Sequence, residues 1–236
     1  MDILGTDHFI EPGRSRRERA LVLDGPAGEL EAVLSHPPVG ATSQALAVVC
    51  HPHPLHQGSL HNKVTLTLAR ALSQMGVPAL RFNFRGVGQS AGSYGGGAGE
   101  VDDLLSILEQ LRERYPDRAL WVAGFSFGAY VALRAAQAFA VDRLITVAPP
   151  INLFDFSTLE PPGCPWLVVQ GTDDELVPAK AVLRWSARTY PAPEVAFMDG
   201  ACHYFHRRLQ DLRTLVEERV ATDPALCALP AQRVSS

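Results

Sequence analysis

A serine between two glycines is the strongest chemical signal in this sequence. The segment Gly124-Phe125-Ser126-Phe127-Gly128 follows an apolar run of strand length, 119–123, and precedes an alanine-rich, helix-prone segment, 130–136. A serine on so sharp a turn has a strained backbone that presents its Oγ to a ligand. Glycines are needed on both sides because a Cβ there would crowd the neighbouring strand and helix. The Phe127 N–H then begins a helix and points to where a tetrahedral oxyanion would form.

A serine hydroxyl also needs partners, because it is a poor nucleophile at neutral pH. It requires a general base, and the base requires a carboxylate to orient it. Asp173 and Asp174 lie in the turn after the apolar run 166–170, and His203 follows the run 194–198. Residues just past the carboxyl ends of parallel strands face one crevice. We therefore expect Ser126, one of the two aspartates and His203 to converge there.

The rest of the chain alternates between strand-like and helix-like segments. Leu30 to Ser35 alternates apolar and polar residues, which predicts an antiparallel edge strand. Further strands are predicted over 45–50, 77–84, 143–148, 166–170 and 194–198, and helices over 62–75, 100–114, 179–188 and 204–220. Strands separated by helices imply right-handed crossovers. The predicted fold class is therefore α/β, with a doubly wound, mostly parallel sheet and helices on both faces.

Length and composition indicate one globular domain. The 236 residues, 47% hydrophobic and 19% charged, predict a single domain over 20–220, a flexible arm over 1–19 and a loose tail over 221–236. A net charge of -4 gives no electrostatic footprint for nucleic acid, and no apolar run approaches the length of a membrane span. Four scattered cysteines and the lack of a signal-like start predict a cytoplasmic location. No glycine-rich nucleotide loop follows a strand, so we expect no cofactor; a homodimer stays open.

Three of these segments together resemble the α/β-hydrolase superfamily. The segment around Ser126 resembles its nucleophile elbow, and Ala201 to Phe205 resembles its histidine loop. Gly171 to Pro178 resembles its Gly-x-x-Asp-x-x-Val-Pro acid turn, which selects Asp174 over Asp173. The chain order serine, aspartate, histidine is also that of the superfamily.

A closer resemblance is to small bacterial predicted hydrolases that lack an inserted cap. They share His51-Pro52-His53-Pro54, Asn62-Lys63-Val64 and the segment Arg81 to Gly88. The resemblance implies hydrolase chemistry without naming a substrate. From the three motifs in this order we predict a serine hydrolase that cleaves an ester or similar small acyl compound through an acyl-enzyme on Ser126, with no metal. The resemblance also implies a second oxyanion donor in the loop after Cys50.

The expected pocket follows from the lengths and types of the loops around it. Pro52 and Pro54 have no N–H, which leaves His51, His53, Leu55 and His56 as second donors, and we predict the Leu55 backbone. The segment 149–163 is too short for a helical cap, so the pocket should be open and shallow. Its predicted rim contains His53, Leu55, Phe125, Phe154 and Phe156. A buried pair between Arg85 and Glu100 is also predicted.

Two other classes of function compete with this hypothesis. His51, His53 and His56 fit a His-x-His-x-x-His pattern after a strand, and three imidazoles could hold zinc with an open position for water. That reading would leave the serine, the aspartate and His203 without a role. A non-catalytic α/β-hydrolase-fold binding protein is the third possibility, although this chain has every piece of the catalytic set.

Overall fold

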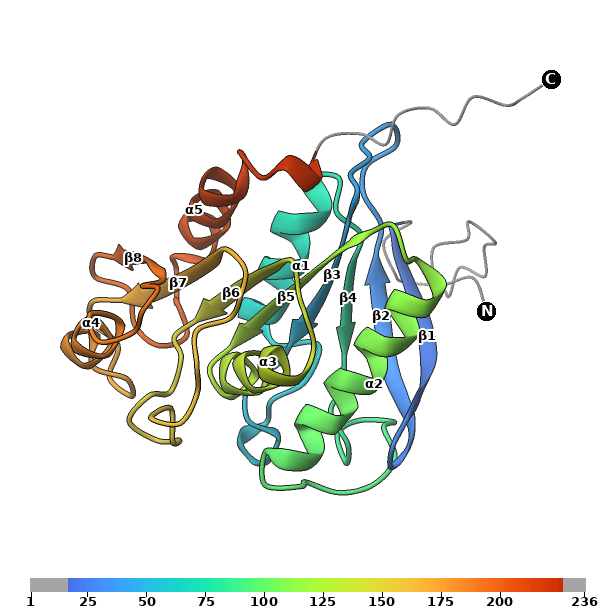
Figure 1. Ribbon diagram of the computed structural model, residues 1–236, viewed down its shortest axis with the longest axis horizontal. Coiled ribbons are helices and arrows are strands. Elements are labelled where there is room, and N and C mark those ends of the chain that lie inside the picture. The colour runs from blue at the N-terminus through green and yellow to red at the C-terminus, as the bar shows by residue number, and fades with distance from the viewer. Residues whose placement is uncertain (1–16, 227–236) are drawn as a thin grey trace.

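The structure, a computed structural model, describes residues 17–226 and contains one mixed sheet. Its eight strands have the spatial order β1-β2-β4-β3-β5-β6-β7-β8, and Figure 1 shows the helices on its two faces. The strands are β1 (Glu18–Gly25), β2 (Gly28–Ser35), β3 (Ala45–Cys50), β4 (Ala79–Phe82), β5 (Ala119–Phe125), β6 (Arg143–Val147), β7 (Trp166–Gly171) and β8 (Glu194–Met198). From β4 to β8 all neighbouring strands pair in parallel, whereas β1 and β2 are antiparallel. The predicted α/β class and mostly parallel sheet are thus confirmed.

The helices cover the two faces as separate layers. They are α1 (Lys63–Gln74), α2 (Ala98–Arg114), α3 (Phe127–Ala138), α4 (Ala179–Ser186) and α5 (Leu209–Val220), with short 3-10 turns η1 (Pro54–His56) and η2 (Pro224–Leu226). One apolar core contains residues of α1 and α5, and the other contains residues of α2, α3 and α4. Strand β3 is buried on both faces because alternate residues of Ala45 to Cys50 enter each core. The continuous apolar run of β3 therefore follows from its central place.

The two ends of the domain differ from the predicted limits. β2 is antiparallel as predicted, but β1 and not β2 is the edge strand. The hairpin turn between Gly25 and Gly28 brings β1 back along β2, and Gly28 supplies the positive φ of 114° that this turn needs. β1 starts at Glu18 and η2 lies beyond residue 220, so ordered elements extend past both predicted boundaries. The rest of the predicted arm and tail lies outside the described residues.

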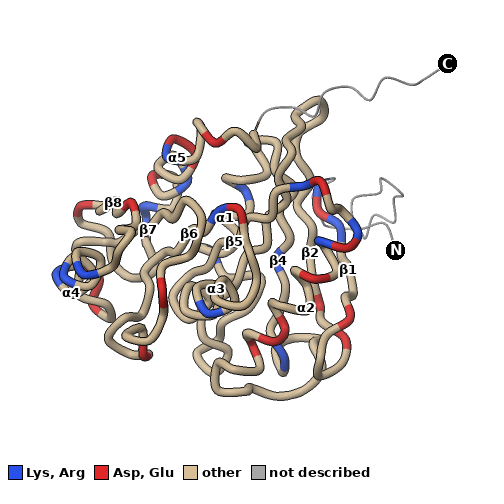
Figure 2. The backbone as a smooth tube through the Cα atoms, in the orientation of Figure 1, with Lys and Arg blue, Asp and Glu red and all other residues tan. Residues whose placement is uncertain are grey.

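No cap is inserted at the carboxyl edge of the sheet between β6 and β7. Residues 148–165 connect β6 to β7 without a helix, as predicted from the length of that segment. Within residues 17–226 there is no helix long and apolar enough to cross a membrane. In Figure 2 the Lys and Arg positions are interspersed with Asp and Glu positions along the described backbone. No helical insertion between β6 and β7 therefore covers the carboxyl ends of the central strands.

Candidate active site

Ser126 lies on a tight elbow between β5 and α3. Its φ of 53° and ψ of −120° lie outside the regions that most residues adopt, and its N–H donates to the Val147 oxygen at 2.8 Å. A Cβ on Gly124 would collide with the Gly128 carbonyl, and a Cβ on Gly128 would lie 2.5 Å from the Cys50 oxygen. Both glycines are therefore required by close backbone packing, which is the reason inferred from the sequence.

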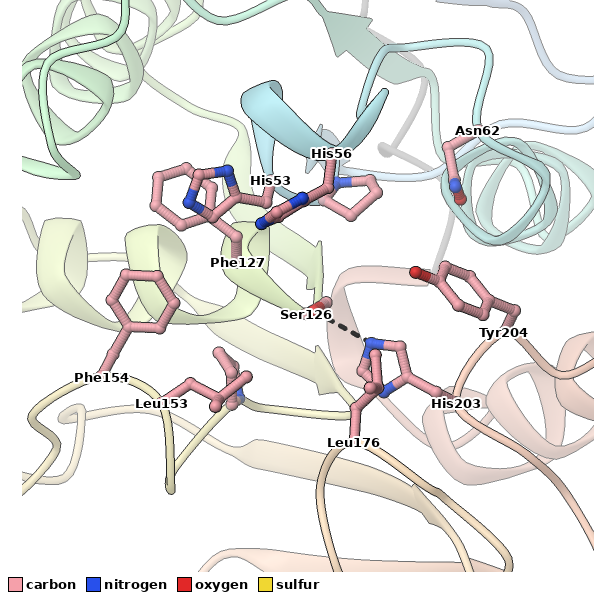
Figure 3. A pocket seen from close by; sticks show the side chains of 12 residues that line it. His53, His56, Asn62, Ser126, Phe127, Leu153, Phe154, Leu176, His203 and Tyr204 are labelled. Atoms are coloured by element: carbon pink, nitrogen blue, oxygen red, sulfur yellow. Dashed lines mark hydrogen bonds between the residues drawn. The ribbon is translucent and has the colours of Figure 1, made fainter.

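Ser126, His203 and Asp174 form a continuous hydrogen-bonded series (Figure 3 shows the first two). His203 Nε2 lies 3.1 Å from Ser126 Oγ, and His203 Nδ1 lies 2.8 Å from Asp174 Oδ2. Because the carboxylate accepts from Nδ1–H, Nε2 is the nitrogen left to accept the serine proton. Three residues that are far apart in the sequence thus meet with the geometry of a nucleophile, a base and an orienting acid.

Asp174, and not Asp173, occupies the position beside the histidine. Its Oδ1 accepts the N–H groups of Leu176 at 2.9 Å and Val177 at 2.7 Å, and its Oδ2 also accepts from Gln170. Burial alone would raise the pKa of the Asp174 carboxyl, but the hydrogen bonds from His203 and Val177 outweigh it and hold that pKa below its ordinary value. The carboxylate is therefore ionised at neutral pH. Asp173 is exposed and contacts only the Thr172 hydroxyl through its side chain.

His203 lies in the loop between β8 and α5. The sequence predicted that the last helix starts near residue 204, but α5 begins at Leu209. Phe205 and Arg207 have φ values of 52° and 61°, and these left-handed conformations keep the segment out of a helix. The His203 N–H donates to Glu175 Oε2 at 3.1 Å, which ties this loop to the acid turn. The loop, and not a helix start, positions the imidazole.

An open cavity of about 500 Å³ lies over Ser126 and His203. Among residues 17–226, no aspartate, glutamate, lysine or arginine lines it. The lining residues are Pro52, His53, His56, Asn62, Ser126, Phe127, Pro150, Leu153, Phe154, Leu176, His203 and Tyr204. A cavity of this size is large enough for a small molecule.

The predicted pocket residues are only partly in this lining. His53 and Phe154 line the cavity as expected, but Phe125 and Phe156 do not. Phe125 points into the core on the α1 and α5 side and packs against His203 with ring centroids 5.2 Å apart. Phe156 is buried between the Tyr130 and Trp185 rings.

Several residues of the lining were not predicted from the sequence, namely Pro52, Asn62, Pro150, Leu153, Leu176 and Tyr204. Leu176 and Tyr204 are direct neighbours of the predicted acid and histidine, so a signal for them was present. Asn62 was noticed only as part of a shared motif. Leu153 lies in the irregular β6–β7 connection, where no periodicity reveals which side chain faces the site.

The loop after β3 changes the prediction for the second oxyanion donor. The Leu55 N–H already donates to His53 Nδ1 at 3.2 Å, and the Leu55 side chain is 67% exposed and outside the lining. The His56 N–H donates to the His53 oxygen at 3.0 Å. Among the described residues, the His53 N–H has no hydrogen-bond partner, and His53 lines the cavity. These contacts argue against Leu55 and in favour of His53.

The histidines of this loop are not arranged as a metal site. His51 is fully buried, its Nδ1 donates to the Pro52 oxygen at 2.6 Å, and its Nε2 accepts the Phe84 N–H at 3.0 Å. Burial lowers the pKa of His51 to about 3, so this imidazole is neutral. Because both ring nitrogens are engaged, His51 cannot act as the third zinc ligand. Within residues 17–226 there is no group of three or more histidine, cysteine, aspartate or glutamate side chains placed to hold a metal.

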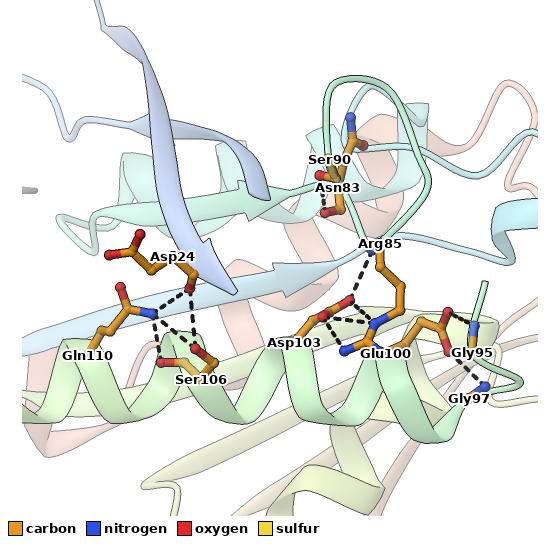
Figure 4. Close-up of polar contacts among 10 residues, drawn as sticks. All are labelled: Asp24, Asn83, Arg85, Ser90, Gly95, Gly97, Glu100, Asp103, Ser106 and Gln110. Atoms are coloured by element: carbon orange, nitrogen blue, oxygen red, sulfur yellow. Dashed lines mark hydrogen bonds and ion pairs between the residues drawn. The ribbon is translucent and has the colours of Figure 1, made fainter. Parts of the chain in front are cut away.

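The glycine-rich loop before α2 is held in place by polar contacts (Figure 4). The predicted pair between Arg85 and Glu100 is wrong, since Arg85 pairs with Asp103 at 2.7 Å. Glu100 instead accepts the N–H groups of Gly95 at 2.8 Å and Gly97 at 2.7 Å, which fixes the loop that carries Tyr94.

Tyr94 in turn holds the His53 ring. Burial and the neighbouring His56 lower the pKa of His53, and its Nδ1 accepts from Leu55, so Nε2 carries the proton. That N–H donates to Tyr94 Oη at 3.1 Å. Hydrogen bonds at both ring nitrogens therefore hold the His53 side chain in place.

Fold and site together define an α/β hydrolase of the serine type. A solved structure from Xanthomonas campestris, described as an α/β serine hydrolase without lid, is 45% identical; the match covers 89% of this chain and 97% of that one, with a TM-score of 0.84. An α/β serine hydrolase homologue from Coxiella burnetii is 42% identical over 86% of this chain and 97% of that one, with a TM-score of 0.83.

The sequence comparisons assign the chain to one family within this class. The family model described as serine aminopeptidase, S33, matches residues 43–163, which is about half of the chain. An uncharacterised protein of Rickettsia prowazekii is 30% identical over 212 residues, 86% of this chain and 88% of that protein. The chain belongs to the S33 serine aminopeptidase family of hydrolases.

Proposed function

We propose that the protein is an esterase that hydrolyses small, neutral acyl compounds through an acyl-enzyme on Ser126. The observation that carries this proposal is the series Asp174–His203–Ser126, which ends at an open cavity lined mainly by aromatic, aliphatic and histidine side chains. The strained elbow and the two hydrogen bonds are what a serine nucleophile with a general base requires.

The reaction would proceed in two acyl-transfer steps. Ser126 Oγ attacks the carbonyl carbon while His203 Nε2 takes its proton, and the carbonyl oxygen becomes an oxyanion. The N–H groups of Phe127 and His53 are the proposed donors to that oxyanion. His203 then gives its proton to the departing alcohol, which leaves an ester between the acyl group and Ser126. Water, deprotonated by His203, attacks that ester and releases the acid and free Ser126.

The cavity lining favours an ester over the peptide that the family description suggests. An aminopeptidase must bind the ammonium group of its substrate, and desolvating that charge requires a nearby carboxylate or several acceptors. No aspartate or glutamate lines the cavity. The lining instead joins aromatic and aliphatic side chains with a few neutral polar groups, which suits an uncharged acyl compound.

A hydrolysis screen tests the proposal. Esters of increasing acyl length would be compared with thioester, lactone and amide analogues and with an amino-acid arylamide, using Ser126→Ala as the blank. Short and medium esters should be cleaved faster than the arylamide, and Ser126→Ala should lose the activity. Hydrolysis that persists unchanged in a folded Ser126→Ala protein would refute the proposal. A parallel assay with a chelator tests the zinc alternative, which predicts loss of activity.

A further inference from the structure

The cavity has two chemically different halves on either side of Ser126. Figure 3 shows Leu153 and Phe154 on one side and Asn62 and Tyr204 on the other. The aromatic wall of the first side is continuous, since the Phe127 and Phe154 rings have centroids 5.5 Å apart. That half is lined mainly by aromatic and aliphatic side chains. Its one imidazole nearest Phe127, that of His53 at 4.8 Å between ring centroids, has both nitrogens engaged by Leu55 and Tyr94. The second half carries an amide and a phenolic hydroxyl.

The Asn62 amide is held in one orientation by helix α1. Its Oδ1 accepts the N–H groups of Val64 at 2.9 Å and Thr65 at 3.3 Å and thereby caps the helix. Because both partners are donors, the oxygen must face the helix, and the amide nitrogen is left as the other end. That nitrogen has no hydrogen-bond partner among the described residues, and Asn62 lines the cavity. Asn62 is therefore a fixed donor for a group outside the protein.

The Tyr204 ring is fixed in a similar way by its neighbours. It packs edge-on against His203, with centroids 5.1 Å apart, and edge-on against Phe125 at 6.1 Å. Its hydroxyl makes no hydrogen bond within residues 17–226, and the residue lines the cavity with 39% of its surface exposed. The hydroxyl can both donate to and accept from a bound molecule.

The position of His203 indicates which part of the substrate meets these two groups. In the proposed reaction His203 Nε2 gives a proton to the leaving oxygen, so that oxygen must lie within hydrogen-bond distance of the imidazole. The alcohol therefore extends on the side of His203, where Tyr204 is in direct ring contact. The acyl group is left with the apolar half.

We propose that Asn62 and Tyr204 form a subsite for the alcohol portion of the substrate. They select esters whose alcohol is neutral and carries a further hydroxyl or carbonyl oxygen, such as the monoesters of a polyol, while an apolar acyl group lies against Phe127 and Phe154. Among the described residues the lining contains no lysine or arginine, which are the side chains that most often pair with a phosphorylated alcohol. This assignment rests on the proposed ester hydrolysis and adds its substrate class.

A matched pair of esters tests the subsite. Glyceryl monobutyrate and propyl butyrate share the acyl group and the length of the alcohol but differ in the two additional hydroxyls. Wild-type protein should favour the glyceryl ester in kcat/KM by about 10-fold, because a neutral hydrogen bond contributes roughly 3- to 10-fold and two such groups are present.

Two variants remove the donors with little change of shape. Tyr204→Phe deletes only the hydroxyl, and Asn62→Ser keeps a helix-capping oxygen but loses the amide. Each should lower the ratio of the two kcat/KM values by roughly 3- to 10-fold. Tyr190→Phe, at a residue outside the lining and 92% exposed, is the matched control and should keep the wild-type ratio. Thermal unfolding of each variant checks that it is folded.

The outcomes separate this inference from the proposed function. An unchanged ratio in both folded variants, with hydrolysis still dependent on Ser126, would overturn the subsite and leave the esterase proposal standing. A wild-type protein that cleaves propyl butyrate as well as the glyceryl ester would overturn it too. Failure to detect any Ser126-dependent hydrolysis of either ester would overturn both.

Discussion

Two buried histidines each follow a strand, but their ring nitrogens have different kinds of partners. His51 follows β3, and both of its ring nitrogens are engaged by the backbone of Pro52 and Phe84. His203 follows β8, and its nitrogens face the Asp174 carboxylate and the Ser126 hydroxyl. Both imidazoles are at the carboxyl edge of the sheet, yet only the second one can exchange a proton with a reactive group. Location at this edge is therefore not sufficient for a chemical role; the partners of both ring nitrogens decide it.

The largest expected difference between substitutions of the two histidines is in catalytic activity. His203→Ala should lower kcat/KM for an ester by about 10⁴- to 10⁶-fold, because the serine loses its only base. His51→Gln should retain most of the activity, since His51 does not line the cavity. Steady-state kinetics with active-site titration measure both values. Similar losses in the two folded variants would show that the contrast between the histidines is wrong.

The two neighbouring aspartates of the acid turn allow a second test, in which Asp173 serves as the control for Asp174. Asp174→Asn removes the charge that orients His203 and should cost about 10⁴-fold in kcat. Asp173→Asn changes an exposed neighbour and should cost less than about 3-fold, as surface substitutions have small effects. A larger loss in the Asp173 variant than in the Asp174 variant would mean that the carboxylates had been assigned in the wrong order.

The oxyanion donors can be separated with proline, which removes a backbone N–H. His53→Pro should lower kcat by about 10²- to 10³-fold more than His53→Ala, because only the proline variant deletes the proposed second donor. The native φ of −54° at His53 is compatible with proline. Leu55→Pro should lower kcat by less than about 10-fold, since that N–H only holds the His53 ring. A deficit in Leu55→Pro that matches the loss of an oxyanion donor would restore the original prediction from the sequence.

The last prediction concerns the pH dependence of the free energy of unfolding and follows from the low pKa of His51. Folding lowers that pKa from 6.5 to about 3, so below pH 6.5 the unfolded chain binds a proton that the folded protein does not. The free energy of unfolding therefore falls as the pH falls, by about 1.4 kcal/mol per pH unit from this residue alone. Urea unfolding between pH 4.5 and 6.5 should show a correspondingly shallower dependence in His51→Gln. Parallel curves for the two proteins would contradict the neutral, buried assignment.

The sequence predicted best those features that depend on local sterics or on strand order. Gly124, Ser126 and Gly128 indicate an elbow because close backbone packing leaves no room for side chains there. The convergence of Ser126, Asp174 and His203 follows from the parallel sheet, whose strand ends meet at one edge. The catalytic roles of these residues stay a proposal, as do the cytoplasmic location and the possible homodimer.

The errors have physical causes that differ from one another. The alternation of side chains along β5 sends Phe125 to the α1 and α5 face, so a period-two count could have excluded it from the cavity. Gly25 and Gly28, where β1 ends and β2 begins, indicate a hairpin that the predicted set of strands does not contain. In contrast, nothing in the local sequence predicts the left-handed conformations of Phe205 and Arg207. The contact that argues against the Leu55 N–H as second donor, with a side chain two residues earlier, is likewise not visible in the sequence.

Labelling with a fluorophosphonate, followed by peptide mass spectrometry, tests the central claim most directly. The probe reacts with a serine only where a base has activated it and donors stabilise the tetrahedral adduct. We expect one stoichiometric adduct on Ser126 in the wild-type protein, and no adduct in His203→Ala under the same conditions. An unlabelled Ser126 in a preparation that hydrolyses esters, or equal labelling when residue 203 is alanine, would contradict the account.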